Sequence, residues 1–329
     1  IADWIALHWE ELQTELQPAS AMCPSESTFR RVLRLIDAPR LDELLTQVES
    51  NPLPPPPAAT GALSSAAEDL PLRAQAVDGK ALRGANAHGA KVHLVSLVRH
   101  ADAITQGQTA VTEKSNEITA VPKLLSAHDL TGTVTTMDAL LTQRALAQQI
   151  LDQHGHYFMV VKANQPELFQ AIQLLFTCPP WTNQERAGEY DKHITQNKGH
   201  GRLERRTLES SSALNGYLDW PGVGQVVRRT CRRINRKTGL ISEEVTYGIT
   251  SLTRRQADAK HLEAIWRGHW TIENRVHYVR DVTLGEDACQ VRAGNAPRVL
   301  ASLRNAILNL MRCFGWNNIS DALRYYAAK

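Results

Sequence analysis

The hydrophobic positions of the first fifty residues recur at the spacing of amphipathic helices. Phe29, Val32 and Ile36 repeat every three or four residues, and Leu41 opens a further repeat of the same kind. This spacing predicts a small helical domain over residues 1–50. Two interpretations stay open: the short helices grip DNA as a helix-turn-helix, or they form a packing or dimerising module that never touches DNA.

Prolines and small residues interrupt this pattern. The run from Pro54 to Pro57 favours extended polyproline II, and the Ala, Gly and Ser residues after it favour flexible chain. We interpret residues 51–70 as a linker, with a proline-rich ligand for another protein as the alternative.

Short runs of apolar or alternating residues follow the linker, as expected for strands. The runs lie at residues 74–77, 92–98, 105–111, 132–137 and 157–161, with a helical repeat at 140–151 between the last two. Three consecutive strands followed by strand, helix and strand predict a mixed sheet with helical crossovers, and hence an α/β fold.

The pattern changes twice more before the chain ends. Residues 176–250 combine Gly, Pro, alternating segments and a dense basic stretch, which predicts a β-rich insertion. From residue 257 the spacing is helical again, and residues 299–311 form a strongly apolar amphipathic repeat. We therefore expect closing helices after the insertion.

Composition narrows the class of protein. Hydrophobic residues make up 43% and charged residues 22% of the 329 residues, as in ordinary globular proteins, and no apolar run is long enough to span a membrane. Five cysteines without a C-x-x-C pair disfavour a disulfide framework and a cysteine zinc site, and fit a cytoplasmic protein. The net charge of +3 permits an acidic partner such as nucleic acid. The start lacks Met and a basic n-region, so we interpret it as truncated or processed, not as a signal peptide.

Two aspartates stand where predicted strands end. Asp78 follows the run at residues 74–77, and Asp138 follows the run at 132–137. Each has an ordinary structural interpretation, because Asp favours Asp-Gly turns, as at 78, and helix N-caps, as at 138. Acids at the ends of two strands of one sheet can also converge on a metal ion, and neither structural interpretation explains why they recur.

A polar row marks one face of the helix predicted near residue 270. His269, Glu273 and His277 are spaced four apart, and therefore share a face. Trp266 and Arg280 lie close to that face, which makes the row too polar for a core stripe. A solvated face is the structural alternative, although such faces seldom carry Trp and two His. A zinc site formed by the two His and the Glu is a competing interpretation without an evident fourth ligand.

Two Asp and one Glu on different elements are the donors that two-metal phosphoryl transfer requires. Hard Mg²⁺ or Mn²⁺ prefers carboxylate oxygens and keeps open positions for water and phosphate. One metal ion activates water or a 3′-hydroxyl, and the other stabilises the leaving oxygen. Basic and aromatic neighbours would hold the polyanionic substrate, so Mg²⁺ or Mn²⁺ is the expected cofactor and DNA the expected partner.

Six strings of the chain match one protein family in order, between about residues 25 and 312. They are 76–85 (AVDGKALRGA), 113–125 (EKSNEITAVPKLL), 134–150, 160–168 (VVKANQPEL), 200–206 (HGRLERR) and 267–297 (RGHWTIENRVHYVRDVTLGEDACQVRAGNAP). On these strings the chain resembles insertion-sequence transposases of the DDE class, in the H-repeat-associated branch. Six ordered motifs are far more specific than any one of them.

The resemblance implies an RNase H-like catalytic core over residues 71–329 that contains the insertion. It implies that Asp78, Asp138 and Glu273 are the catalytic acids and the metal ligands. The implied activity is metal-dependent cleavage at the terminal inverted repeats of an element and transfer of the 3′ ends to target DNA, by a homodimer at the bacterial nucleoid. A nuclease on the same fold and a catalytically inactive DNA-binding remnant are the alternatives, and retention of all three acids disfavours the remnant.

Further acids follow Glu273 on the last matching string. Asp281 is the reserve candidate for the third acid. Glu286 and Asp287 come directly after Gly285, so we expect them beyond the helix, in a turn or a structural ion pair.

The expected DNA contacts lie mostly in or beside the acid-bearing strings. In the related larger group of transposases, Tyr is usual where Trp266 stands and Lys is often found where Arg280 stands. Arg is common where His269 stands in relatives outside this branch. Cationic groups beside three carboxylates make sense if a polyanion and metal ions complete the charge balance. A solvated strand pair is the alternative for the basic insertion. The full expected set is Lys80, Arg83, Lys114, Lys162, Asn164, Arg202, Trp266, Arg267, His269, His277 and Arg280.

Overall fold

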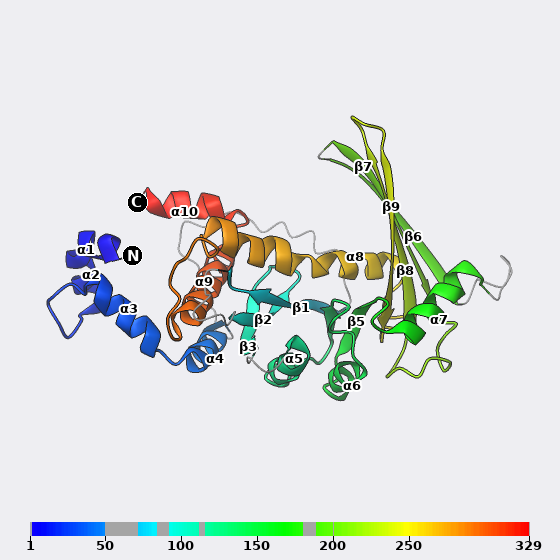
Figure 1. Ribbon diagram of the computed structural model, residues 1–329, viewed down its shortest axis with the longest axis horizontal. Coiled ribbons are helices and arrows are strands. Elements are labelled where there is room, and N and C mark those ends of the chain that lie inside the picture. Colours follow the sequence, from blue (N-terminus) through cyan, green and yellow to red (C-terminus); the bar gives the residue numbers. More distant parts are fainter. Residues whose placement is uncertain are drawn as a thin grey trace.

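A computed structural model describes residues 2–49, 72–83, 92–111, 116–179, 189–199 and 201–328. Within this part of the chain, one large sheet runs through the molecule with helices on both of its faces (Figure 1). The predicted α/β class is therefore confirmed. The predicted linker at residues 51–70 lies outside the described residues.

Nine strands of the described chain form the sheet, in the order β3-β2-β1-β4-β5-β9-β8-β7-β6. Strands β1, β4 and β5 run parallel, and all other neighbours are antiparallel. The five strands predicted before the insertion are β1 to β5. The bounds are β1 Arg73–Ala81, β2 His93–Arg99, β3 Thr105–Val111, β4 Thr133–Met137, β5 His156–Val161, β6 Tyr190–Gly199, β7 Arg202–Ser211, β8 Gln225–Asn235 and β9 Ile241–Thr250.

Helices cover the sheet from both sides. Figure 1 shows α5 and α6 on one face and α8 on the opposite face. No helix in the described ranges is both long enough and apolar enough to cross a membrane. The bounds are α5 Glu117–Ser126, α6 Arg144–Asp152, α7 Pro166–Thr177, α8 Ala259–His269, α9 Ala296–Cys313 and α10 Ile319–Ala327, with π-helical segments η3 Ile272–His277 and η4 Val279–Thr283.

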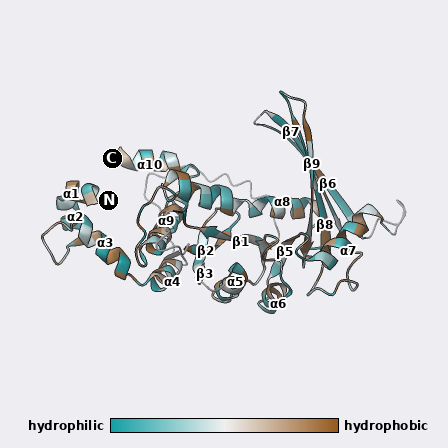
Figure 2. Ribbon diagram, in the orientation of Figure 1, coloured by the Kyte–Doolittle hydropathy of each residue, from teal (hydrophilic) through white to brown (hydrophobic). Residues whose placement is uncertain are grey.

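The central strand β1 contributes to a different core on each face. Val77 is fully buried in the cluster that α5, α6 and α7 build, whereas Ala76 is buried in a cluster with Ile272 and Val276 of η3. Figure 2 shows β5 as a predominantly hydrophobic strand, whereas hydrophobic and hydrophilic residues mix along β1. Because successive side chains of a strand point to opposite faces, Asp78 lies on the same face as Ala76, toward η3.

The predicted insertion extends the sheet instead of forming a separate body. Its last strand, β9, pairs with β5, so that Phe158 lies opposite Thr250 and Val161 lies opposite Tyr247. Strands β6 to β9 then project past the helices as a long arm (Figure 1). The arm is therefore continuous with the strands that carry the candidate acids.

The chain leaves the regular α-helix where the third candidate acid stands. After α8 the backbone widens into η3 and η4, and the Tyr278 N–H donates to the carbonyl of Glu273, five residues earlier. The spacing predicted a helix here, and the structure refines that prediction to a π-helical one. Such segments are rare and frequently occur at functional sites.

The N-terminal helices lie at the end of the molecule opposite the arm (Figure 1), where α3 and α4 pack against α9. Arg298 donates to Asp42 at 2.8 Å, and the Ser302 hydroxyl donates to the same carboxylate at 2.5 Å. The predicted helical character is confirmed, whereas a role of these helices in DNA binding or dimerisation stays a prediction. Their bounds are α1 Ala2–Leu7, α2 Trp9–Leu16, α3 Glu26–Leu35 and α4 Ala38–Glu49.

Candidate active site

Asp78 and Asp138 lie side by side because their strands are in register. Val77 of β1 pairs with Met137 of β4 in the parallel ladder. Asp138 directly follows the end of β4, as expected, whereas Asp78 lies within β1, which continues to Ala81, so the strand end and the Asp-Gly turn considered at Asp78 are wrong. Val77 and Met137 are both buried against the α5 and α6 face, so alternation directs both aspartates to the other face. Asp138 also accepts a hydrogen bond from the Leu141 N–H at 3.1 Å in the turn that follows β4. The N-cap role considered for it is wrong, because α6 begins at Arg144 with Gln143 as its N-cap.

Glu273 faces this pair from η3. Its neighbours Ile272 and Val276 are buried with Ala76 of β1, and this packing places η3 over the aspartate side of the sheet. Asp78 and Glu273 line the same open cleft, which has a volume of about 600 Å³. The other residues that line the cleft are Gly79, Lys80, Ala81, Leu82, Arg83, His277, Tyr278 and Asp281.

The negative charges of the site lack compensation. Burial raises the pKa of Asp78 to about 7, and a hydrogen bond from the Gly79 N–H offsets part of that rise. Nearby negative charges raise this pKa further, and they belong to Glu117, Asp138 and Glu273. Carboxylates gathered in this way favour a cation or a proton between them.

A buried histidine contacts the first aspartate. His277 Nδ1 lies 3.6 Å from Asp78 Oδ2. Burial lowers the pKa of His277 to about 3, and the positive charges of Arg280 and Lys80 lower it further, so the ring is neutral at pH 7. Its Nε2 is buried and has no hydrogen-bond partner among the described residues. The neutral ring therefore does not neutralise Asp78.

The donor set fits Mg²⁺ or Mn²⁺ in chemistry, although it is not assembled in advance. Carboxylate oxygens are the ligands these ions prefer, and burial together with neighbouring carboxylates raises the pKa of Asp78. Within the described ranges, no three His, Cys, Asp or Glu side chains are already arranged to hold one ion. Binding would therefore have to draw the carboxylates together. The alternative zinc site of His269, Glu273 and His277 is likewise not formed.

A threonine joins the sheet to the end of α8 behind the acids. Thr136 Oγ1 lies 3.0 Å from His269 Nδ1 and 3.0 Å from His100 Nε2, and the hydroxyl donates to the Gln75 carbonyl at 3.1 Å. Burial lowers the pKa of His100 to about 3 and also lowers the pKa of His269. Two neutral histidines therefore share one hydroxyl, a link that the sequence pattern did not reveal. His269 serves the structure here.

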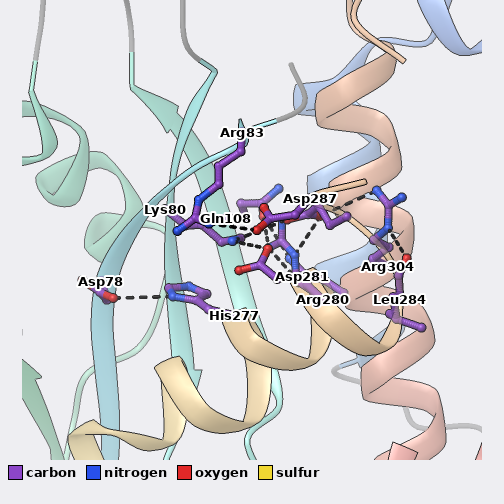
Figure 3. Close-up of polar contacts among 12 residues, drawn as sticks. Asp78, Lys80, Arg83, Gln108, His277, Arg280, Asp281, Leu284, Asp287 and Arg304 are labelled. Atoms are coloured by element: carbon purple, nitrogen blue, oxygen red, sulfur yellow. Dashed lines mark hydrogen bonds and ion pairs between the residues drawn. The ribbon is translucent and has the colours of Figure 1, made fainter. Parts of the chain in front are cut away.

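Arg280 is not a DNA contact, contrary to the expectation from sequence. It is 0% exposed, and its guanidinium donates to both oxygens of Glu286 at 2.9 Å (Figure 3). Asn305 and Gln108 accept further hydrogen bonds from it, at 3.2 and 3.3 Å. No donor is left for a phosphate, and the ion pair expected for Glu286 is confirmed.

Lys80 is also engaged within the protein. Its Nζ lies 2.5 Å from Asp281 Oδ1 and 3.9 Å from Glu286 Oε1, and its side chain is only 9% exposed (Figure 3). Lys80 therefore forms the wall of the cleft, and it balances the charge of Asp281. This pairing favours Glu273 over Asp281 as the third acid.

The remaining expected contacts divide into buried and exposed groups. Trp266 is 5% exposed and packs edge-on against Phe158, so its expected contact with DNA is corrected to a core role. Arg83 is 80% exposed, beside Asp287 at 3.3 Å. Lys114 lies outside the described residues. The other exposed members of the set are Lys162, Asn164, Arg202 and Arg267.

Glu117 is a further acid of the site that the sequence pattern did not single out. It opens α5, and its Oε1 lies 2.7 Å from His93 Nε2. The available signal was its place in the second matching string, directly ahead of an apolar helix. Only the fold shows that this helix begins beside Asp78.

Comparisons with known proteins complete the description. Residues 69–310 match a family model described as a transposase DDE domain. The putative transposase YncI of Escherichia coli O157:H7 is 33% identical over 245 residues, which cover 72% of this chain and 61% of the relative. The H repeat-associated putative transposase YhhI of Escherichia coli K12 is 30% identical over 246 residues, 72% of this chain and 63% of the relative. The chain thus spans less than two thirds of the length of these relatives.

A solved structure also matches, weakly. A piggyBac transposase synaptic complex with hairpin DNA aligns at a TM-score of 0.40 and 11% identity, over 76% of this chain and 48% of that one. At this score the two folds agree only loosely, and the sequence matches alone define the relationship.

Proposed function

Because the chain belongs to the DDE transposase family, as its resemblance to H-repeat-associated transposases predicted, we propose that it cuts DNA at the ends of an insertion sequence and joins the 3′ ends to target DNA. One observation carries the proposal. Asp78 of β1 and Asp138, directly after β4, follow the paired residues Val77 and Met137 of two parallel strands, and Glu273 lines the cleft with Asp78. We assign β1 to β5, with the helices around them, as an RNase H-like core.

The three acids have one role in this proposal, and the surrounding residues have others. Asp78, Asp138 and Glu273 would hold Mg²⁺ or Mn²⁺, which when bound lowers the pKa of an attacking water and stabilises the leaving oxygen. His277 lies against Asp78 without adding charge, because burial lowers the pKa of its ring. The Lys80–Asp281 pair keeps the neighbouring wall neutral.

The exposed basic residues would bind the DNA backbone. Arg83 lines the cleft, Lys162 follows the end of β5, and Arg267 is exposed on α8. Phosphate contacts of this kind position DNA without reading its sequence. Two element ends must be processed together, which favours a homodimer, and the substrate places the enzyme at the nucleoid in the bacterial cytoplasm.

The test is cleavage and strand transfer with defined DNA ends. A labelled duplex carrying the terminal inverted repeat should be cut in Mg²⁺, and a pre-cleaved end should become joined to a target plasmid. Asp138→Asn should abolish both reactions while retaining binding. Hydrolysis without a joined product would show that the protein is a nuclease and not a transposase. DNA binding without hydrolysis would identify an inactive remnant.

A further inference from the structure

The acidic cleft has a fourth carboxylate, which approaches from the opposite face of the sheet. Glu117 opens α5, and α5 packs against the face of β1 that buries Val77. Its side chain is largely buried, and His93 on the neighbouring strand β2 holds it at 2.7 Å. The other three acids lie toward η3. Glu117 therefore reaches the same end of β1 from behind.

Glu117 can occupy this position because residue 79 is glycine and has no side chain. A Cβ at residue 79 would lie 2.1 Å from Glu117 Oε1 and 2.6 Å from His93 Nε2, distances that no side chain could keep. The carboxylate therefore rests against the backbone directly after Asp78, and a side chain at residue 79 would displace it. The absence of a side chain at this position brings the fourth acid beside the first.

The ion pair with His93 does not satisfy Glu117 on its own. Burial raises the pKa of Glu117, and the charge of Asp138 raises it further, although His93 acts in the opposite direction. The position of Glu117 against the backbone of Gly79, the residue after Asp78, is what a structural pair with His93 alone does not require.

We propose that Glu117 is a fourth carboxylate of the divalent-cation site, reaching it past Gly79 with His93 as its positioning residue. This inference rests on the proposed function, which places the cation at Asp78 and Asp138. An added hard oxygen donor strengthens the binding of Mg²⁺ or Mn²⁺, since the number of charged ligands sets the affinity. Asp78 and Asp138 would then coordinate the ion from one face of the sheet, and Glu117 would coordinate it from the other.

The experiment measures binding of Mn²⁺ itself, by electron paramagnetic resonance of the purified chain at pH 8 without DNA. Glu117→Gln keeps the shape of the side chain and should weaken Mn²⁺ binding by about tenfold. Gly79→Ala should weaken it similarly, because the added methyl group displaces the carboxylate. Glu43→Gln is the matched control, since Glu43 is an exposed helical glutamate paired with Arg40, and it should bind like the wild type.

The outcomes separate this inference from the proposed function. If the wild type binds Mn²⁺, Asp138→Asn does not, and Glu117→Gln binds like the wild type, the fourth-ligand role is overturned and the transposase proposal survives. If the wild type itself binds no Mn²⁺, the cation site and the proposed function both fail. Circular dichroism checks folding. Should Glu117→Gln unfold, wild-type affinity in folded Gly79→Ala would overturn the inference.

Discussion

At the scale of single residues, the cleft separates cations that serve the fold from cations that face solvent. Arg280 and Lys80 neutralise Glu286 and Asp281 inside the protein. Arg83, a few residues along the chain from Lys80, projects into solvent. Charge alone does not distinguish these roles, whereas burial does, and each role predicts a different response to mutation.

The first prediction concerns Asp78 and pH. The folded state keeps a proton on Asp78 up to about pH 7, while the unfolded chain loses it near 3.8, so this carboxyl lowers stability progressively as the pH rises from about 4 to 7. Asp78→Asn cannot ionise. In chelator at pH 8 it should therefore melt roughly 2–6 °C above the wild type.

Thermal unfolding at pH 4.5 and pH 8 checks this prediction. The advantage of Asp78→Asn should nearly vanish at the lower pH, where the wild-type carboxyl is protonated in the folded state. Asp219→Asn is the control, because Asp219 is exposed, and it should show no such dependence. A variant that melts below the wild type at pH 8 would show that the charge of Asp78 is already compensated.

The second prediction separates Arg280 from DNA. Arg280→Ala leaves Glu286 buried without its bidentate partner, which should cost about 3–5 kcal/mol of unfolding free energy. Chemical denaturation measures this loss. At a temperature where the variant stays folded, the salt dependence of DNA binding should match the wild type. A flatter slope in folded protein would restore Arg280 as a phosphate contact.

The third prediction concerns Arg83, whose side chain is exposed, in contrast to the buried side chain of Arg280. Arg83→Ala removes an exposed guanidinium, so stability should change by less than about 0.5 kcal/mol. If Arg83 contacts one phosphate, the log–log slope of affinity against salt should flatten by about 0.9. Binding titrations at several salt concentrations test this. A changed choice among terminal repeats would instead make Arg83 a base reader.

At the scale of elements, the site depends on how the end of α8 is fixed to the sheet. Thr136 on β4 links His269 at the end of α8 to His100 after β2. From that point the chain widens into η3, which carries Glu273. The position of the third acid is therefore set by a side chain of the strand that precedes the second acid.

The fourth prediction tests this link. Thr136→Val keeps the shape of the side chain and removes the hydroxyl, leaving buried imidazole groups without their partner. It should lower the unfolding free energy by about 1–3 kcal/mol and reduce cleavage by displacing η3. Thr109→Val, on the edge strand β3, is the control for β-branched replacement. Full activity in Thr136→Val would show that packing of Ile272 and Val276 positions η3 unaided.

The sequence predicted elements well where the signal is local. The short apolar runs located both β1 and β4, because this signal lies in neighbouring residues. They also placed Asp138 directly after β4, whereas β1 continues past Asp78 to Ala81. The sequence pattern could not predict the burial of Arg280, since its partners Gln108 and Asn305 come from distant parts of the chain. Glu117 was missed for the same reason. Glu117 opens helix α5, and its significance depends on Gly79 of β1 and His93 of β2.

At the scale of the whole molecule, one sheet connects three regions of the protein. The N-terminal helices dock at one end, the acids lie in the middle, and the β6–β9 arm projects from the other end (Figure 1). Because β9 pairs directly with β5, DNA bound by the arm would be held in a fixed relation to Asp138.

The fifth prediction concerns the docking of the N-terminal helices. Arg298→Ala leaves the largely buried carboxylate of Asp42 with the Ser302 hydroxyl as its remaining donor among the described residues. The helices should detach more often, and limited proteolysis should cleave the N-terminal segment several-fold faster, while the core resists as before. Arg40→Ala, which disrupts only an exposed pair with Glu43, is the control. Equal proteolysis of all three proteins would show that apolar packing alone holds these helices.

The pairing of β5 with β9 also has a consequence for the timing of synthesis. Strand β5 cannot pair with β9 until Thr250, the partner of Phe158, has been synthesised. Glu273 is synthesised later still, so the site around Asp78 is completed last. Contacts between such distant positions form slowly, and on the ribosome they cannot form until the later partner has emerged. We expect a nascent chain to carry both aspartates without a working site until η3 leaves the exit tunnel. An incompletely synthesised chain would then lack the proposed cleavage activity. It could not cut the DNA from which its own mRNA is being transcribed.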